Sequence, residues 1–162
     1  MTDARSGSVV MTLAMAQLPM RVGDVAANAD RVVSASLDAR DRLGADVIVF
    51  PELTLTGYPP EDLLFRPDFL GQVERAIDRV RDAVSGITVV LGFPSRQGAS
   101  LFNAAAVYRD GQCLGTCHKH HLANHGVFDD RRYFEAGTGS LVFEVGGARC
   151  AVTICEDLWH AG

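Results

Sequence analysis

Three residues that suit carbonyl chemistry follow strand-like stretches of this 162-residue sequence. Each comes after a run of apolar or β-branched side chains: Glu52 after 47–51, Lys119 after 113–118, and Cys155 after 150–154. A thiol, a carboxylate and an ammonium group at one place would supply a nucleophile, a general base and a cation for a developing oxyanion. The sequence therefore points to attack on a carbonyl carbon, provided that the fold brings the three strand ends together.

Cys155 marks the change from a strand pattern to an acidic segment, which we interpret as the start of a helix. Backbone N–H groups at the start of a helix have no partner within it, and their dipoles favour negative charge. We therefore expect a thiolate at Cys155, with a pKa below the value of about 8.5 in free cysteine.

The first half of the sequence reads as alternating strands and helices. The predicted elements are a buried strand over 9–18, a helix from the N-cap Asp24 to Gly44, a buried strand over 46–50, an ordered loop over 54–67, a helix over 67–84 and a strand over 87–91. Apolar side chains recur at helical spacing in the first helix, at Val25, Ala29, Val32, Val33, Leu37 and Leu43. This order predicts parallel strands, and Glu52 then lies at their carboxyl ends, where α/β proteins place their sites.

The second half of the sequence changes to hairpins. The stretches 104–108 and 113–117 flank Asp110-Gly111, and the stretches 141–145 and 148–154 flank Gly146-Gly147. Such residue pairs favour the tight turns of antiparallel hairpins. The fold class is therefore mixed α/β, with parallel strands first and antiparallel hairpins later.

Composition describes an ordinary globular domain, with 48% apolar and 22% charged residues. A net charge of −5 argues against nucleic acid as the main partner, because phosphate binding needs a basic face, so we expect no nucleic-acid partner. The apolar run 9–16 is too short to cross a membrane and lacks a cleavage site, so we expect no membrane association, a cytoplasmic protein and reduced cysteines. Glycine-rich phosphate loops do not occur in the sequence, so we expect no nucleotide cofactor in this segment.

A structural zinc site is the alternative use of the cysteines. Cys113, Cys117 and His118, together with Cys150 and Cys155, are of the types that bind zinc. Their spacings differ from those of the common zinc fingers. We therefore expect no metal in this segment and keep a zinc-binding module as an alternative hypothesis.

Three segments, in order, resemble the signature regions of the carbon–nitrogen hydrolase (nitrilase) superfamily: Phe50–Leu53, His118–Leu122 and Ile154–Asp157. The segments 56–64, 126–134 and 155–159 are similar to the glutaminase domain of glutamine-dependent NAD synthetases. The resemblance extends over essentially the whole chain. It implies a four-layer α-β-β-α sandwich, of which residues 1–162 would be the N-terminal part.

The resemblance also implies roles for the three residues. Cys155 attacks the side-chain amide of glutamine, Glu52 takes the thiol proton and passes it to the departing ammonia, and Lys119 stabilises the oxyanion. The ammonia then passes to a synthetase domain of the same chain, absent from this segment, which uses ATP and Mg²⁺ to convert nicotinic acid adenine dinucleotide to NAD. We also expect a homo-oligomer.

Two positions depart from the pattern of these synthetases. His125 stands where they commonly have tyrosine, which changes a contact with glutamine, and Asp130 stands where they have a second glutamate. Because the side chain of Asp130 is shorter, we expect it to position Lys119 less well. By resemblance, Tyr58, His125 and Glu156 contact the substrate, with Glu156 at its amino group.

The sequence stops at Gly162, seven residues after Cys155, whereas the domain of the superfamily continues well past its nucleophile. We therefore expect the 162 residues alone to fold poorly and to be inactive. Two other functions stay open: a stand-alone amidase of the same superfamily that acts on another small amide, and a non-catalytic binding module.

Overall fold

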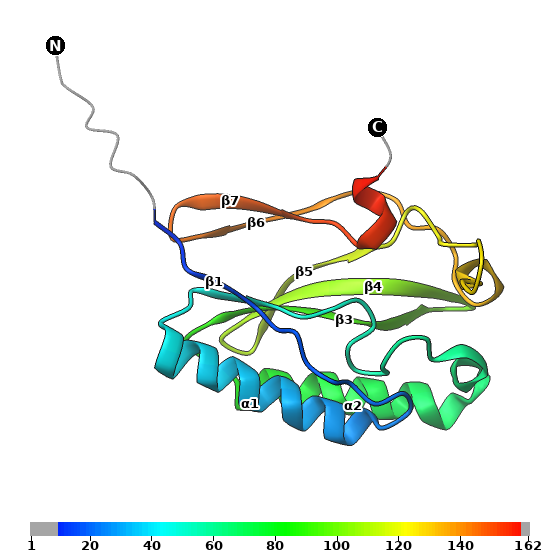
Figure 1. Ribbon diagram of the computed structural model, residues 1–162, viewed down its shortest axis with the longest axis horizontal. Helices are drawn as coiled ribbons and strands as arrows, with labels where there is room; N and C mark the ends of the chain where they lie inside the picture. The colour runs from blue at the N-terminus through cyan, green and yellow to red at the C-terminus, as the bar shows by residue number, and fades with distance from the viewer. Residues whose placement is uncertain (1–9, 160–162) are drawn as a thin grey trace, which may run out of the picture.

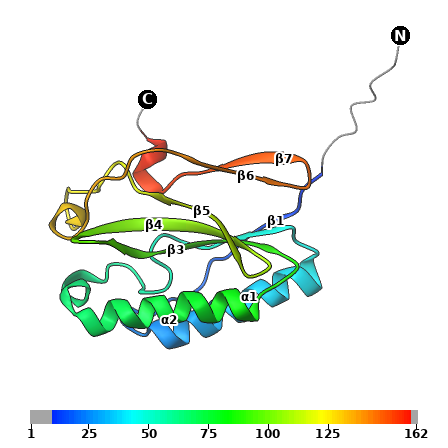
Figure 2. The same cartoon turned by 180° about the vertical axis from the view of Figure 1, so that it is seen from behind.

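Two helices, a five-stranded sheet and a two-stranded hairpin form three successive layers (Figures 1 and 2). The computed structural model describes residues 10–159, so Val9, with which the predicted first strand begins, lies outside the described residues. The elements in chain order are β1 (Leu13–Met15), α1 (Val25–Leu43), β2 (Val47–Val49), η1 (Glu61–Phe65), α2 (Pro67–Ala83), β3 (Thr88–Gln97), β4 (Ser100–Arg109), β5 (Gln112–His118), η2 (Asp130–Arg132), β6 (Leu141–Val145), β7 (Ala148–Val152) and η3 (Cys155–Leu158). The mixed α/β class is confirmed.

Local chemistry sets the ends of α1, as the sequence predicts. The carboxylate of Asp24 accepts a hydrogen bond from the backbone N–H of Ala27 at 3.3 Å, which satisfies one of the unpaired donors of the first turn. Gly44 ends the helix in the left-handed conformation, with φ of 61°. Leu43 was expected on the buried face, but it is 58% exposed, because the buried stripe of the helix ends one turn earlier at Ala39.

The strand order β1-β2-β3-β4-β5 combines both kinds of pairing. β1, β2 and β3 pair in parallel, whereas β3–β4 and β4–β5 are antiparallel. Two reversals return the chain to its first direction, so β5 runs the same way as β2. The carboxyl ends of β2 and β5 therefore lie at the same edge of the sheet.

The hairpin of β3 and β4 is much longer than the sequence pattern suggests. Each strand has ten residues, and the register pairs Thr88 with Arg109 at one end and Gln97 with Ser100 at the other. The sequence predicts only the stretches 87–91 and 104–108, because the intervening residues include Pro94 and Asn103, which are rare in strands. The two hairpins predicted at Asp110-Gly111 and Gly146-Gly147 are confirmed.

The expectation of a buried first strand is wrong. Only Leu13–Met15 pair as a strand, with Leu13 46% exposed and Met15 82% exposed. β1 is an edge strand. The side chain of Ala14, which lies between Leu13 and Met15, packs on the opposite face, against the cluster beneath the helices. Figure 1 shows the hairpin β6–β7 over the face of the sheet that is opposite to the helices.

Apolar side chains fill both gaps between the layers. The larger cluster lies between the helices and the sheet and includes Val32, Val73 and Leu91. The smaller cluster joins the sheet to the hairpin β6–β7 through residues such as Val107 and Phe143. Since β3 and β4 are covered on both faces, they form a rigid base for the loops at the ends of the strands. None of the helices within residues 10–159 is both long and apolar enough to cross a membrane.

Candidate active site

Glu52 lies in the turn that follows β2, and the sheet fixes the backbone of this turn. The N–H of Phe50 donates to the carbonyl of Val90 at 2.9 Å, which continues the pairing with β3. A Cβ atom at Gly92 would lie only 2.6 Å from the carbonyl oxygen of Pro51. The turn therefore rests directly on the backbone of β3, and this close contact sets the position of Glu52.

Lys119, the sole lysine of the sequence, directly follows β5, and its side chain is fully buried. Its Nζ lies 2.7 Å from Oε1 of Glu52 and 2.8 Å from Oδ2 of Asp130. Burial by itself would lower the pKa of this ammonium group, but the hydrogen bonds with Asp130 and Glu52 outweigh burial and raise the pKa above the ordinary lysine value. Lys119 is therefore a cation at neutral pH, held between two carboxylates.

Asp130 reaches Lys119 although its side chain is one methylene shorter than glutamate. The N–H of Asp130 donates to the carbonyl of Ala123 at 2.9 Å, which folds the segment after Lys119 back toward the end of β5. The hydroxyl of Tyr58 donates to Oδ1 of Asp130 at 3.4 Å. Burial and the negative charges of Asp130 and Glu52 raise the pKa of Tyr58, which keeps its hydroxyl protonated.

Asn103 is a member of this cluster that sequence reasoning missed. It lies in β4 and is completely buried. Its Nδ2 donates to Oε1 of Glu52 at 2.6 Å, and its backbone carbonyl accepts the N–H of Lys119 at 2.8 Å. The available signal in the sequence was an asparagine inside an otherwise apolar strand, next to Ala104 and Ala105.

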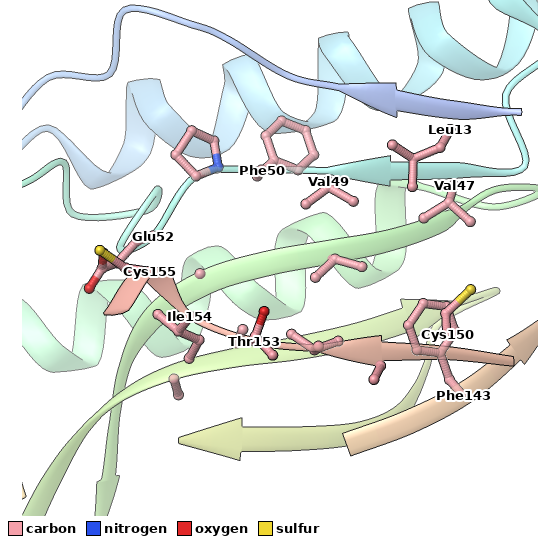
Figure 3. A pocket seen from close by; sticks show the side chains of 17 residues that line it. Leu13, Val47, Val49, Phe50, Glu52, Phe143, Cys150, Thr153, Ile154 and Cys155 are labelled. Atoms are coloured by element: carbon pink, nitrogen blue, oxygen red, sulfur yellow. The ribbon is translucent and has the colours of Figure 1, made fainter. Parts of the chain in front are cut away.

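Cys155 lies beside Glu52 at one end of a cavity between the sheet and the hairpin, as Figure 3 shows. The cavity has a volume of about 280 Å³, and apolar side chains such as Val49 and Ile154 form most of its wall. Cys155 begins η3 with φ of 49°, a left-handed conformation that is uncommon for a residue with a side chain. The two sheets thus bring a thiol from the end of β7 to a carboxylate from the end of β2.

The expectation of a thiolate at Cys155 is wrong. Partial loss of water and the negative charge of Glu52 raise the pKa of this thiol. Lys119 and the backbone N–H of Glu156 act in the opposite direction but are weaker. The predicted helix is only a four-residue 3₁₀ turn, so few aligned peptide dipoles face the sulfur. Cys155 therefore carries its proton at neutral pH.

Asp157, also missed by sequence reasoning, ties the Cys155 turn to the segment after Lys119. Its Oδ1 accepts the backbone N–H groups of His120 at 3.0 Å and His121 at 2.9 Å. Its Oδ2 accepts the N–H of Ile154 at 3.2 Å. One carboxylate thus joins two segments that lie 36 or 37 residues apart in the sequence.

The predicted substrate-binding residues divide into two groups. Nε2 of His125 lies 2.7 Å from Oε1 of Glu156, and both residues line a separate cavity of about 520 Å³. Glu156 is buried, whereas 63% of the His125 side chain is exposed. Tyr58 instead contacts the ion-pair cluster through Asp130, and its ring lies 6.1 Å from that of Phe128. None of the three lines the cavity at Cys155 and Glu52.

The cysteines of the zinc hypothesis do not gather. Cys113 is exposed on β5, Cys117 is buried and donates to the carbonyl of Ala105, and Cys150 lies with its sulfur 4.0 Å from that of Met11. Within residues 10–159, no group of three or more His, Cys, Asp or Glu side chains is arranged to hold a metal ion. The described residues thus give the zinc hypothesis no site.

Known proteins share both the sequence and the fold of this chain. Residues 12–161 match the family described as Carbon-nitrogen hydrolase. The glutamine-dependent NAD(+) synthetase of Xylella fastidiosa (strain Temecula1) is 50% identical over 156 residues, and the match covers 95% of this chain and 29% of that protein. The glutamine-dependent NAD+ synthetase from Acinetobacter baumannii, solved with ADP, has a TM-score of 0.87 and 40% identity, with coverage of 91% of this chain and 28% of that chain.

A smaller enzyme shares the fold as well. The Nesterenkonia AN1 amidase from the nitrilase superfamily has a TM-score of 0.81 and 25% identity, with coverage of 93% of this chain and 57% of that chain. The present chain thus spans less than a third of the synthetases that it matches and about half of the amidase. Its layers of helices, sheet and hairpin are those of the N-terminal part of the nitrilase fold. Because the family match includes nearly all residues, the chain belongs to the carbon–nitrogen hydrolase family.

Proposed function

We propose that this chain hydrolyses the side-chain amide of glutamine and supplies the ammonia to a synthetase domain of the same protein, which makes NAD from nicotinic acid adenine dinucleotide. The observation that carries the proposal is the cluster of Glu52, Lys119 and Asp130 beside the Cys155 thiol. The relatives that are named glutamine-dependent NAD synthetases support the choice of glutamine and of NAD formation.

Glu52 acts as the general base in this proposal, because Cys155 carries a proton that must leave before the sulfur can attack. Cys155 and Glu52 lie side by side at one end of the cavity, so the proton has a short path to the carboxylate. Glu52 removes this proton as the C–S bond to the amide carbon forms. A free thiolate is therefore never needed at rest, which agrees with the raised pKa of Cys155.

Lys119 stabilises the negative charge that develops on the amide oxygen. An ammonium group has three N–H donors, and Glu52 and Asp130 accept two of them. The third donor serves the oxyanion of the tetrahedral intermediate. Asp130 keeps the cation in place and acts as a positioning residue.

The remaining steps use the same groups. When the C–N bond breaks, Glu52 returns the proton to the nitrogen, which leaves as ammonia, and a γ-glutamyl thioester remains on Cys155. Glu52 then deprotonates a water molecule that attacks the thioester. The C–S bond breaks, the proton returns to the sulfur, and glutamate leaves.

Tyr58, His125 and Glu156 are the residues that we propose to contact the rest of the substrate. The buried carboxylate of Glu156 is complementary to the α-ammonium group of glutamine. His125 is hydrogen-bonded to Glu156 and lines the same cavity, so it would approach the same end of the substrate. Tyr58 would act from the side of Asp130.

Replacement of Cys155 by alanine in the full-length protein tests the proposal. We expect glutamine-dependent NAD formation to disappear, while formation from free ammonium chloride continues at the parent rate, because the synthetase step needs no thiol. Cys113→Ala, at an exposed thiol away from the cavity, is the matched control and should retain both activities. A Cys155→Ala protein that still uses glutamine would contradict the proposed nucleophile.

The likeness to the Nesterenkonia amidase makes a stand-alone amidase the second candidate. The same assay separates the two, since an amidase without a synthetase partner would form NAD from neither nitrogen source. It would instead release ammonia from other small amides, such as propionamide, at rates above that for glutamine.

Three further expectations stay predictions: a cytoplasmic location, assembly as a homo-oligomer, and the use of ATP and Mg²⁺ in the synthetase domain. Light scattering on the purified full-length protein would give its oligomeric state. Chelation of Mg²⁺ should stop NAD formation but leave ammonia release from glutamine intact, because the cysteine mechanism needs no metal ion.

A further inference from the structure

Asn103 contacts both the proposed base and the proposed cation, through different parts of the residue. Its side-chain Nδ2 donates to Oε1 of Glu52 at 2.6 Å, and its backbone carbonyl accepts the N–H of Lys119 at 2.8 Å. The residue is completely buried in β4. A change of its side chain therefore alters the contact with Glu52, while the backbone contact with Lys119 can remain.

Oε1 of Glu52 is fully used by its two partners. Nδ2 of Asn103 and Nζ of Lys119 both donate to this oxygen, at 2.6 and 2.7 Å. A carboxylate oxygen has two lone pairs in the plane of the group, so two donors occupy it. Any proton that Glu52 accepts must then go to Oε2.

We infer that Asn103 is a positioning residue for the proposed hydrolysis, and that it holds Oε1 of Glu52 so that only Oε2 exchanges protons with Cys155. The inference rests on the proposed function, in which Glu52 is the base. A neutral amide suits this task, because it orients the carboxylate without adding a charge. A second cation at this position would weaken Glu52 as a base, and a carboxylate would repel it.

The unused atom of Asn103 supports a role beyond folding. Its Oδ1 is buried, and among residues 10–159 it accepts no hydrogen bond. A buried acceptor without a partner lowers stability, and an apolar side chain of similar size, such as leucine, would avoid this loss. Packing alone therefore does not account for asparagine here, whereas its donor to Glu52 does.

Substitution of Asn103 by leucine in the full-length protein removes the donor and keeps the volume. We expect kcat for glutamine to fall at least about tenfold with KM within about twofold of the parent, since Glu52 is no longer oriented. The acid side of the pH–rate profile should move toward higher pH, because a hydrogen bond that favours the charged carboxylate is lost. The ionisable groups that face Glu52 are Lys119 after β5, Asp130 of η2, Cys155 of η3 and Tyr58.

Two controls keep a structural effect apart from a positioning effect. NAD formation from ammonium chloride should stay at the parent rate, which reports on the fold and on the synthetase step. Thr88→Val removes a buried hydroxyl at the far end of the same sheet, where it accepts a bond from Arg109, and should leave the pH profile unchanged. Asn103→Ala provides a second variant if the leucine variant does not fold.

Alkylation of Cys155 by iodoacetamide tests the inference without requiring that the protein hydrolyse glutamine. Without the Asn103 donor, the negative charge of Glu52 is less compensated and acts more strongly on the neighbouring thiol, so the pH midpoint of alkylation should rise by roughly 0.5–1 unit. If the parent protein does not hydrolyse glutamine but this midpoint moves, the proposed substrate fails and the contact of Asn103 with the base stands. Parent-like kcat, pH profile and alkylation in both Asn103 variants would overturn the inference. Equal losses of NAD formation from glutamine and from ammonium chloride would overturn it as well.

Discussion

Nζ of Lys119 lies 2.7 Å from Oε1 of Glu52, so the proposed cation and the proposed base form a direct ion pair. The side chain of Lys119 is fully buried, whereas that of Glu52 is 18% exposed. Glu52 lines the cavity at Cys155, and Lys119 contacts the same carboxylate from within the protein. Because a second carboxylate, Asp130, also binds this ammonium group, the cluster keeps one net negative charge next to the thiol.

Lys119→Met should destabilise the domain strongly. The substitution keeps most of the volume but leaves two carboxylates without their cation, which typically costs about 3–5 kcal/mol for a buried pair. Denaturant unfolding would measure the change. Arg42→Met is the control, because Arg42 forms an exposed pair with Asp38 and its loss should cost less than about 1 kcal/mol.

The loss of unfolding free energy in Lys119→Met should depend on pH in one definite direction. The fold raises the pKa of Lys119, so its contribution is complete below the unfolded lysine pKa of about 10.4 and is lost only as the pH rises through the folded value. The difference in unfolding free energy between the parent and Lys119→Met should therefore stay the same from about pH 7 to about pH 9 and shrink at higher pH. A difference that shrinks between those two values would contradict the raised pKa.

Alkylation of Cys155 in the parent protein should show a midpoint above about pH 8.5, the value of a free thiol. Glu52→Gln removes the negative charge that raises this pKa, so its midpoint should be lower than that of the parent. Mass spectrometry of the peptide that contains Cys155 would follow the reaction, with the exposed thiol of Cys113 as an internal reference. A parent midpoint below neutral pH would instead support the thiolate that the sequence suggested.

Asp157→Ala should separate the Cys155 turn from the segment after Lys119. Three backbone N–H groups lose their charged acceptor, and we expect a loss of stability of roughly 1–3 kcal/mol. kcat should fall by about tenfold or more, because small displacements of a nucleophile are costly. Asp82→Ala, at an exposed carboxylate on α2, should change neither quantity, and parent-like turnover in Asp157→Ala would refute this role.

Gly92→Ala should displace Glu52 from its position. The added Cβ atom would lie 2.6 Å from the carbonyl oxygen of Pro51 and 2.7 Å from the nitrogen of Leu53, so the turn must move away from β3. We expect kcat to fall about tenfold or more and the melting temperature to drop. Gly71→Ala in α2 is the matched control, since its Cβ has ordinary contacts and should stabilise the helix by about 0.5–1 kcal/mol.

Local backbone chemistry is what the sequence alone determined. Asp24 and Gly44 set the ends of α1, and the turn at Asp110-Gly111 sets a hairpin, because each depends on residues only a few positions apart. The strand ends also identified Glu52, Lys119 and Cys155, since residue type and the end of an apolar run are both visible in the sequence. The resemblance to a family then gave these residues their order and their roles.

The tertiary structure alone decided how these groups act on one another. The side chain of Asn103 reaches Glu52 across 51 positions of the sequence and that of Asp157 reaches His120 and His121 across 36 or 37, and no local pattern reports such distances. The pKa of Cys155 rises rather than falls because the fold removes part of its water and places a carboxylate from 103 positions away in the chain beside it, and these two effects outweigh the few dipoles of a short turn. Charge interactions depend on separation in space and on burial, and both are fixed only when the strands pair and the layers pack.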